Sequence, residues 1–261
     1  MPRFTASDGA EIHYEVDADD GRPALVLSNS LGTALEMWDG QLAAARARFR
    51  VVRYDNRGHG RSSVPAGEYS IARLGRDAVE LLDALAIERA AFCGLSMGGM
   101  VGLWLAANAG HRLSRVALCN TTAHMPPAET WNARIATVKT QGMAALADGI
   151  IERWFTPPFR AREMATVARV KAMILATDPI GYAGCCAAVR DMDQRGDLGR
   201  IAVPTLVVAG AEDPATPPAM GAGIAAAIPG ARLEVIENCA HLSNIEQPAA
   251  FDAAAFGFLG A

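Results

Sequence analysis

The sequence lacks the features that mark secreted, membrane-spanning or nucleic-acid-binding proteins. The start, Met1–Thr5, leads into polar residues and not into an apolar signal segment. No stretch approaches the roughly 20 continuous apolar residues that cross a bilayer. Lysine and arginine number 24 against 28 acidic residues, so the net charge is −4 and no general basic field favours nucleic acid. We therefore expect a cytoplasmic protein without a nucleic-acid or membrane partner.

The cysteines also lack a pairing pattern. There are five, an odd number, and no two have the Cys-x-x-Cys spacing. This argues against both a disulfide framework and a zinc site, so no metal is expected. We expect mostly small buried residues, with the adjacent pair Cys185 and Cys186 as a weak candidate for redox chemistry.

Hydrophobic residues make up 51% of the 261 residues and charged residues 20%, which is ample for a core. Short apolar runs alternate with segments of helical periodicity, a pattern typical of parallel strands joined by crossover helices. The expected strands are Glu11–Val16, Ala24–Ser28, Phe49–Tyr54, Ala91–Cys93, Val116–Asn120, Thr205–Ala209 and Leu233–Ile236. The expected helices are Ile71–Leu85, Met97–Asn108, Pro218–Ile228 and Pro248–Phe258. We predict one α/β sheet with helices on both faces.

The alternation stops over residues 122–195, where the pattern is helical throughout. We expect this block to form a helical cap inserted into one core domain made of residues 1–121 and 196–261. Residues 123–195 contain nine basic and seven acidic residues, a net charge of +2. The remainder contains 15 basic and 21 acidic residues, a net charge of −6. A mildly basic cap on an acidic body hints at an anionic ligand.

A serine with glycine two residues before and two after follows the expected strand Ala91–Cys93, in the segment Gly94-Leu95-Ser96-Met97-Gly98. A helical run opens directly after it. Strand, sharp turn and helix are the context that a nucleophile elbow requires, because the glycines relieve crowding while the serine hydroxyl projects above the sheet. We interpret Ser96 as a nucleophile and not merely as part of a glycine-rich turn.

A serine nucleophile needs a base and an orienting acid, which in this arrangement follow it in the order acid, then histidine. Asp213 follows the strand Thr205–Ala209, and His241 follows the last strand. Glu212 is a rival acid, which we interpret as a solvated loop residue. The other histidines are His13, His59, His111 and His124, and none satisfies the chain order. His59, on a loop after a strand, is interpreted as structural.

An oxyanion hole supplies two backbone N–H groups to the developing negative charge. The N–H of Met97, directly after the nucleophile, is the first expected donor. The second should come from the loop after the strand Ala24–Ser28, and we assign it to Leu31, with Ser30 as the alternative.

With these residues the chain resembles the α/β-hydrolase family over nearly its whole length, including Asp55-x-Arg57-Gly58-x-Gly60-x-Ser62. Where many members have His-Gly, this chain has Asn29-Ser30, which is similar to the 3-oxoadipate enol-lactonase subgroup of aromatic-compound catabolism. The segments that share this resemblance are residues 153–157, residues 181–186 and residues 240–244. The resemblance implies an α/β-hydrolase fold with a mostly parallel sheet of about eight strands, opening of an enol-lactone through an acyl-enzyme (β-ketoadipate pathway), and no cofactor.

The resemblance also implies a small anionic lactone substrate, whose carboxylate the cap should meet with an arginine. Arg134 is our preferred residue, with Arg153 and Arg190 as rivals and with Trp131 and Trp154 as apolar walls. A broad carboxylesterase or a hydrolase of carbon–carbon bonds would use the same triad. A non-enzymatic receptor of the same fold is the remaining alternative, and a homo-oligomer is left open.

Overall fold

Eight strands form a single sheet in the computed structural model, which describes residues 2–261. The strands are β1 (Arg3–Thr5), β2 (Glu11–Val16), β3 (Ala24–Ser28), β4 (Arg50–Tyr54), β5 (Ala90–Leu95), β6 (Leu113–Cys119), β7 (Thr205–Gly210) and β8 (Arg232–Ile236). Their order across the sheet is β1-β2-β4-β3-β5-β6-β7-β8. The expected fold class is confirmed.

All strands from β3 to β8 pair in parallel, while β1 and β2 form an antiparallel edge. Every residue of β3, β5 and β7 is buried. Helices cover both faces of these strands, which explains why they appear in the sequence as short unbroken apolar runs. The sequence interpretation missed β1, because three residues of mixed exposure carry too little periodicity to predict a strand.

Eleven α-helices accompany the sheet in residues 2–261. They are α1 (Leu42–Arg46), α2 (Ile71–Ala84), α3 (Met97–Asn108), α4 (Ala128–Gln141), α5 (Ala144–Trp154), α6 (Pro157–Arg162), α7 (Met164–Ala176), α8 (Pro179–Asp191), α9 (Pro218–Ala227), α10 (Ser243–Glu246) and α11 (Pro248–Leu259). Three short 3-10 helices are η1 (Leu35–Gln41), η2 (Gly110–Arg112) and η3 (Arg195–Arg200).

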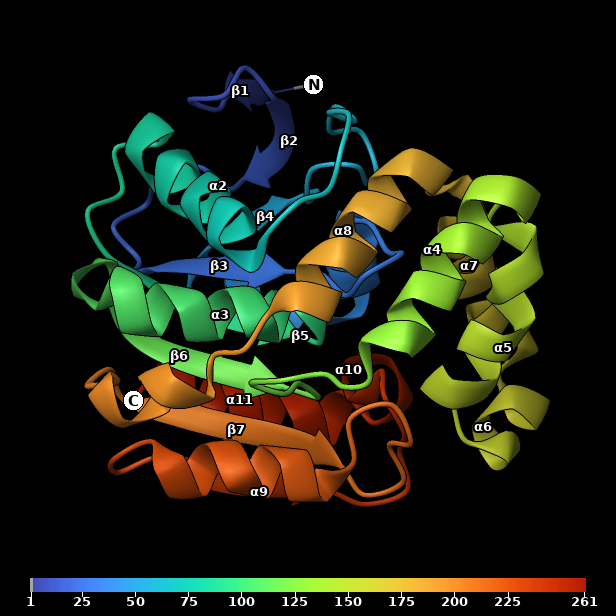
Figure 1. Ribbon diagram of the computed structural model, residues 1–261. Helices are drawn as coiled ribbons and strands as arrows, with labels where there is room; N and C mark the ends of the chain where they lie inside the picture. Colours follow the sequence, from blue (N-terminus) through green and yellow to red (C-terminus); the bar gives the residue numbers. More distant parts are fainter. Residues whose placement is uncertain (1) are drawn as a thin grey trace.

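Helix α3 packs against β3, β5 and β6, with α2 beside it on the same face, while α11 packs from behind the sheet (Figure 1). Because α3 lies between the sheet and other elements, it is apolar around most of its circumference and nine of its residues are buried. Helix α2 is amphipathic and begins after Ser70, whose hydroxyl accepts a hydrogen bond from the N–H of Arg73. The expected helix ends differ from the observed ones by a residue or less.

The helices α4 to α8, which we call the cap helices, occupy the chain between β6 and β7. They lie beyond the arrowheads of the parallel strands, with α8 crossing back over the sheet (Figure 1). The division into a core of residues 1–121 and 196–261 and a cap of residues 122–195 stays a prediction. One contact shows how tightly α8 approaches the core: a Cβ atom on Gly181 would lie 2.3 Å from the carbonyl oxygen of Gly58.

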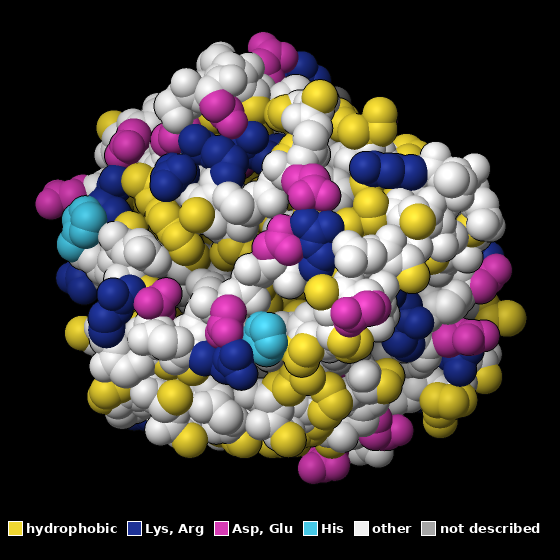
Figure 2. All heavy atoms as spheres, in the orientation of Figure 1, with side chains coloured by type: hydrophobic (Ala, Val, Ile, Leu, Met, Phe, Trp, Pro, Cys, Tyr) yellow, Lys and Arg dark blue, Asp and Glu magenta, His cyan; other side chains and the backbone are white. Residues whose placement is uncertain are grey.

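Acidic and basic side chains are interspersed on the face shown in Figure 2, with hydrophobic side chains among them. No single helix within residues 2–261 is long and apolar enough to cross a membrane, and α7 and α8 reach such a length only as a pair bent by 94°.

The backbone contact between Gly181 and Gly58 predicts an unusual response to alanine. Gly181→Ala should lower the free energy of unfolding by about 1–3 kcal/mol, because overpacking outweighs the gain in helix propensity. Gly223→Ala in α9 is the matched control, since no atom lies within 4 Å of its added Cβ. It should stabilise the protein by about 0.5–1 kcal/mol. Urea unfolding of both variants checks this, and shifts of the same sign would contradict it.

Candidate active site

Ser96 occupies a strained turn between β5 and α3, with φ 57° and ψ −114°. The two flanking glycines make the turn sterically possible. A Cβ atom on Gly94 would lie 2.0 Å from the carbonyl oxygen of Gly98, and one on Gly98 would lie 2.2 Å from that of Ser28. The turn is held by hydrogen bonds from Ser96 N–H to the carbonyl of Cys119 and from the Thr121 hydroxyl to the carbonyl of Ser96.

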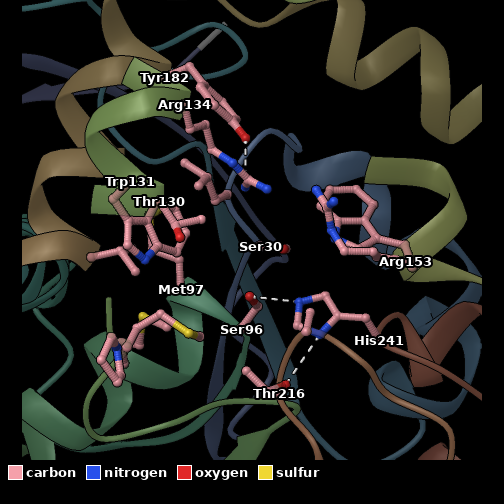
Figure 3. Close-up of a pocket in the computed structure, with 17 residues that line it drawn as sticks. Ser30, Ser96, Met97, Thr130, Trp131, Arg134, Arg153, Tyr182, Thr216 and His241 are labelled. Carbon is pink, nitrogen blue, oxygen red and sulfur yellow. Dashed lines mark hydrogen bonds between the residues drawn. The ribbon is translucent and has the colours of Figure 1, made fainter. Parts of the chain in front are cut away.

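The turn directs the Ser96 hydroxyl at a histidine and, through it, at an aspartate. Ser96 Oγ lies 2.8 Å from His241 Nε2, and His241 Nδ1 lies 2.8 Å from Asp213 Oδ2. All three side chains are buried or nearly so. Asp213 follows β7 and His241 follows β8, so the structure brings together the three residues that the chain order had suggested. Figure 3 shows Ser96 and His241 facing one another at the base of a pocket.

Asp213 is held as a carboxylate by several donors. Its Oδ1 accepts the N–H groups of Ala215 and Thr216, at 2.8 and 3.0 Å. Its Oδ2 accepts the Thr216 hydroxyl and the Asn120 amide, at 2.7 and 3.0 Å. Burial disfavours the charge, but the neighbouring His241 and these hydrogen bonds outweigh it and lower the pKa of Asp213 to about 2. Ionised Asp213 orients the ring with its Nδ1 proton toward the carboxylate.

Asn120 was missed by the sequence interpretation. It directly follows β6 at a positive φ of 44°, and its amide also donates to the carbonyl of Ala240, beside His241. A polar residue directly after a buried parallel strand is a signal that points to the same sheet edge as Ser96.

Met97 and Leu31 both line the pocket, and neither of their backbone N–H groups has an acceptor within residues 2–261. Met97 begins α3, where the first N–H groups of a helix have no partner within the helix. In the segment Ser30–Thr33, which we call the oxyanion loop, the Ser30 N–H donates to Met37 Sδ at 3.3 Å. Between the two alternatives for the second donor, this geometry favours Leu31 over Ser30.

The pocket has a volume of about 250 Å³ and lies between the strand ends and the cap helices. Trp131 and Trp154, expected as apolar walls, both line it. The Trp154 ring also stacks on the His241 ring, with centroids 6.1 Å apart and an interplanar angle of 29°. Trp154 therefore both lines the cavity and restricts the orientation of the histidine ring.

Arg134 and Arg153 reach the pocket from opposite sides (Figure 3). Arg134 donates to the Tyr182 hydroxyl at 3.2 Å and stacks over the Trp131 ring, and neither arginine has an ion-pair partner within residues 2–261. Partial desolvation and the like charge of Arg134 lower the pKa of Arg153. Arg190 does not line the pocket, and its guanidinium pairs with Glu68 and Asp191.

The rival acid and the other histidines lie elsewhere. Glu212 is exposed, as expected. His13 is buried against Asp55, with 3.0 Å between Nδ1 and Oδ2. His124 contacts the carbonyl of Met192, and His59 lies beneath the oxyanion loop. His111 lies in η2, which contacts α3 away from the pocket.

The weak redox candidate finds no support in the structure. Cys185 and Cys186 are free thiols that are both fully buried. Burial raises the pKa of each thiol, that of Cys186 to about 12, so the reactive thiolate form is disfavoured.

A buried carboxylate joins the cap helices to the histidine loop. Glu246, 4% exposed, accepts hydrogen bonds from the N–H of Ala240 at 3.0 Å and from the N–H and hydroxyl of Thr156. The N–H of Leu242 donates to the carbonyl of Trp154. The chain at the end of α5 is therefore joined to the residues directly before and after His241. The sequence did not indicate this connection.

Comparison with known proteins agrees with this geometry. A family model described as the alpha/beta hydrolase fold matches residues 23–248. The chain is 44% identical to 3-oxoadipate enol-lactonase 2 of Acinetobacter baylyi, over 95% of this chain and 92% of that protein. The enol-lactonase of Burkholderia xenovorans LB400 is 45% identical with a TM-score of 0.97, covering 100% of both chains. A hydrolase of Pseudomonas aeruginosa PA01 is 50% identical with a TM-score of 0.96, covering 100% of this chain and 98% of that one.

Replacing Asp213 tests whether its hydrogen bond to His241 is needed for catalysis. Asp213→Asn should lower kcat about 10⁴-fold, because the amide keeps the shape but favours the wrong imidazole tautomer. Glu212→Gln is the control and should stay within about twofold of the parent protein, since exposed side chains contribute little. Steady-state kinetics on an aryl ester measures both. Equal losses in the two variants would show that Asp213 is not the orienting acid.

Proposed function

The chain belongs to the α/β-hydrolase fold family, and we propose that it is a serine hydrolase that opens the lactone ring of 3-oxoadipate enol-lactone to give 3-oxoadipate. In this role it serves aromatic-compound catabolism through the β-ketoadipate pathway. The similarity to two enol-lactonases over nearly full length supports the substrate class.

One observation carries the proposal. The hydrogen-bonded triad of Ser96, His241 and Asp213 lies at a pocket that is also lined by two arginines without an acidic partner within residues 2–261. The triad supplies an activated nucleophile. The arginines supply positive charge that a small anionic substrate would neutralise. An ester hydrolase for neutral substrates has no need of this pair, because unpaired charge near a low-dielectric cavity is costly.

In the first half of the reaction, Ser96 Oγ attacks the lactone carbonyl carbon while His241 Nε2 takes the hydroxyl proton. The carbonyl oxygen becomes negative and accepts hydrogen bonds from the N–H groups of Leu31 and Met97. Each such donor contributes about 3–4 kcal/mol to transition-state stabilisation. Asp213 stabilises the imidazolium that forms.

Collapse of the tetrahedral intermediate breaks the bond between the carbonyl carbon and the ring oxygen. The ring oxygen leaves as an enol that receives the proton from His241 and then tautomerises to a ketone. An enolate is a better leaving group than a simple alkoxide, so it needs only modest protonation. Water, deprotonated by His241, then attacks the acyl-enzyme, and 3-oxoadipate is released with Ser96 reprotonated.

The substrate carboxylate is assigned to Arg134. Its guanidinium is oriented by the Tyr182 hydroxyl and by the Trp131 ring, with 5.0 Å from Cζ to the ring centroid. An arginine that is already oriented loses less conformational entropy when it binds a carboxylate. Arg153, on the opposite side, adds positive potential to the same cavity.

The proposal includes a small anionic lactone as the partner and a cytoplasmic location, with no nucleic acid, membrane or cofactor involved. Fractionation of cells that express the protein tests the location. Size-exclusion chromatography with light scattering tests whether the protein is a homo-oligomer.

The substrate class is tested by assaying purified protein on 3-oxoadipate enol-lactone, simple aryl esters and a ring-cleavage diketone. Loss of the ultraviolet absorbance of the enol-lactone should be by far the fastest reaction. A preference for aryl esters or for the diketone would assign the protein to the carboxylesterases or to the hydrolases of carbon–carbon bonds. Ser96→Ala should lower kcat by about 10⁶-fold and abolish labelling by a fluorophosphonate.

The carboxylate assignment predicts a charge-dependent loss of binding. Arg134→Met should raise KM for the anionic lactone by about 10- to 100-fold, the effect of losing a hydrogen bond to a charged group. KM for a neutral aryl ester should change little. Arg190→Met is the matched control, because this cap arginine lies outside the pocket, and it should alter neither value. Equal effects of Arg134→Met on both substrates would overturn the assignment.

A further inference from the structure

We infer that His59, which does not line the pocket, is a positioning residue that holds the Leu31 N–H in place as an oxyanion donor. The role rests on the acyl-transfer chemistry proposed for Ser96. It does not depend on which ester or lactone is the substrate.

The two ring nitrogens of His59 have different partners. Nε2 lies 2.9 Å from the backbone nitrogen of Gly32, and Nδ1 lies 3.2 Å from the carbonyl oxygen of Arg57. A carbonyl oxygen only accepts, so Nδ1 carries the hydrogen and Nε2 presents its lone pair to the Gly32 N–H. His59, 1% exposed, therefore acts as a neutral acceptor beneath the oxyanion loop.

The N–H of Gly32 is the next backbone N–H along the chain after that of Leu31, the proposed oxyanion donor. Its peptide nitrogen is bonded to the carbonyl carbon of Leu31, so its direction restricts the backbone of that residue. In the oxyanion loop the N–H groups of Ser30, Gly32 and Thr33 all have acceptors. The Leu31 N–H is the remaining one, and Leu31 is among the residues that line the pocket.

The loop is confined from a second side. Gly32 has φ +80°, and a Cβ atom placed on it would lie 3.1 Å from the Tyr182 ring. The Tyr182 hydroxyl also accepts the hydrogen bond from Arg134. His59 and Tyr182 thus hold the oxyanion loop between them, and Tyr182 links it to the arginine assigned to the substrate carboxylate.

His59 is itself held rigidly. It lies between two glycines of positive φ, and a Cβ atom on Gly60 would lie 2.3 Å from the Asp55 carboxylate carbon. Asp55 in turn accepts the N–H groups of Leu35 and Arg61, at 2.8 and 2.9 Å. The buried carboxylate of Asp55 therefore connects the loop that carries His59 to Leu35, which lies four residues after Leu31.

The environment of His59 keeps the ring neutral. Burial lowers the pKa of His59 to about 4, although the hydrogen bond to the Arg57 carbonyl opposes this shift. The guanidinium of Arg57 points away and pairs with Asp8 and Asp77, while the Cys185 thiol lies 3.9 Å from Nδ1. The acceptor is therefore available at neutral pH.

Two substitutions separate the two hydrogen bonds of His59. In His59→Gln the amide oxygen reaches the place of Nε2 and keeps an acceptor for Gly32, while the bond to Arg57 is lost. In His59→Asn the shorter side chain keeps a donor for Arg57 and leaves the Gly32 N–H without an acceptor. Both variants are polar and smaller than histidine, so they form a matched pair for stability.

We expect His59→Asn to lower kcat by about 10- to 100-fold with KM within about threefold, because a displaced donor weakens binding of the transition state more than binding of the substrate. His59→Gln should retain most of the parental kcat. Affinity for a boronic acid that forms a tetrahedral adduct with Ser96 should fall in parallel with kcat. Cys185→Ala alters the packing beside His59 but leaves His59 Nε2 as the acceptor for the Gly32 N–H, so kcat should stay near the parental value.

Assays on a neutral aryl ester and on the enol-lactone separate this inference from the proposed substrate. If only the lactone assignment is wrong, the difference between the two His59 variants persists on the ester. The inference is overturned if the Asn and Gln variants have the same kcat and boronic acid affinity at matched folded fraction, or if the loss lies in KM alone. Should His59→Asn fail to fold, a parental kcat in His59→Gln with parental boronic acid affinity supports the inference, and a tenfold loss of both in that variant overturns it.

Discussion

The backbone of Ser96 is confined to a left-handed turn, and the arrangement of the site depends on that constraint. A non-glycine residue at φ 57° and ψ −114° carries a strain of about 1–3 kcal/mol, which persists only where the surroundings determine it. Here β5 is buried on both faces and α3 is locked against three strands. The strain places the Ser96 hydroxyl at the first turn of a helix, where backbone N–H groups favour developing negative charge.

Parallel pairing from β3 to β8 then collects the remaining groups at one edge of the sheet. Asn120, Asp213 and His241 all follow the carboxyl ends of strands, although 93 residues separate Asn120 from Asp213 and 28 separate Asp213 from His241. Each group enters through a short loop from a buried strand, so little conformational freedom remains to be lost during catalysis.

The cap helices are joined to this edge at both ends of the pocket. Near His241, Glu246 and Trp154 fasten the end of α5, and near the oxyanion loop, Gly181 and Tyr182 bring α8 against the core. The arginines that face the cavity come from α4 and α5. The groups proposed for substrate recognition and those proposed for charge stabilisation therefore belong to one connected framework.

The sequence by itself determined the strands other than β1, the turn at Ser96 and the order of nucleophile, acid and base. The strands follow from local periodicity, and the turn follows from glycines at fixed spacing. It left open Leu31 against Ser30, and Arg134 against Arg153 and Arg190. It missed Asn120 and Glu246, and it assigned His59 no more than a structural role. Only the tertiary structure shows that Arg190 lies outside the pocket and which groups Asn120, Glu246 and His59 contact, since Gly32, which donates to His59, lies 27 residues away and Thr156, which donates to Glu246, lies 90 residues away. Local patterns predict elements, whereas which side chains meet is determined by how distant elements pack.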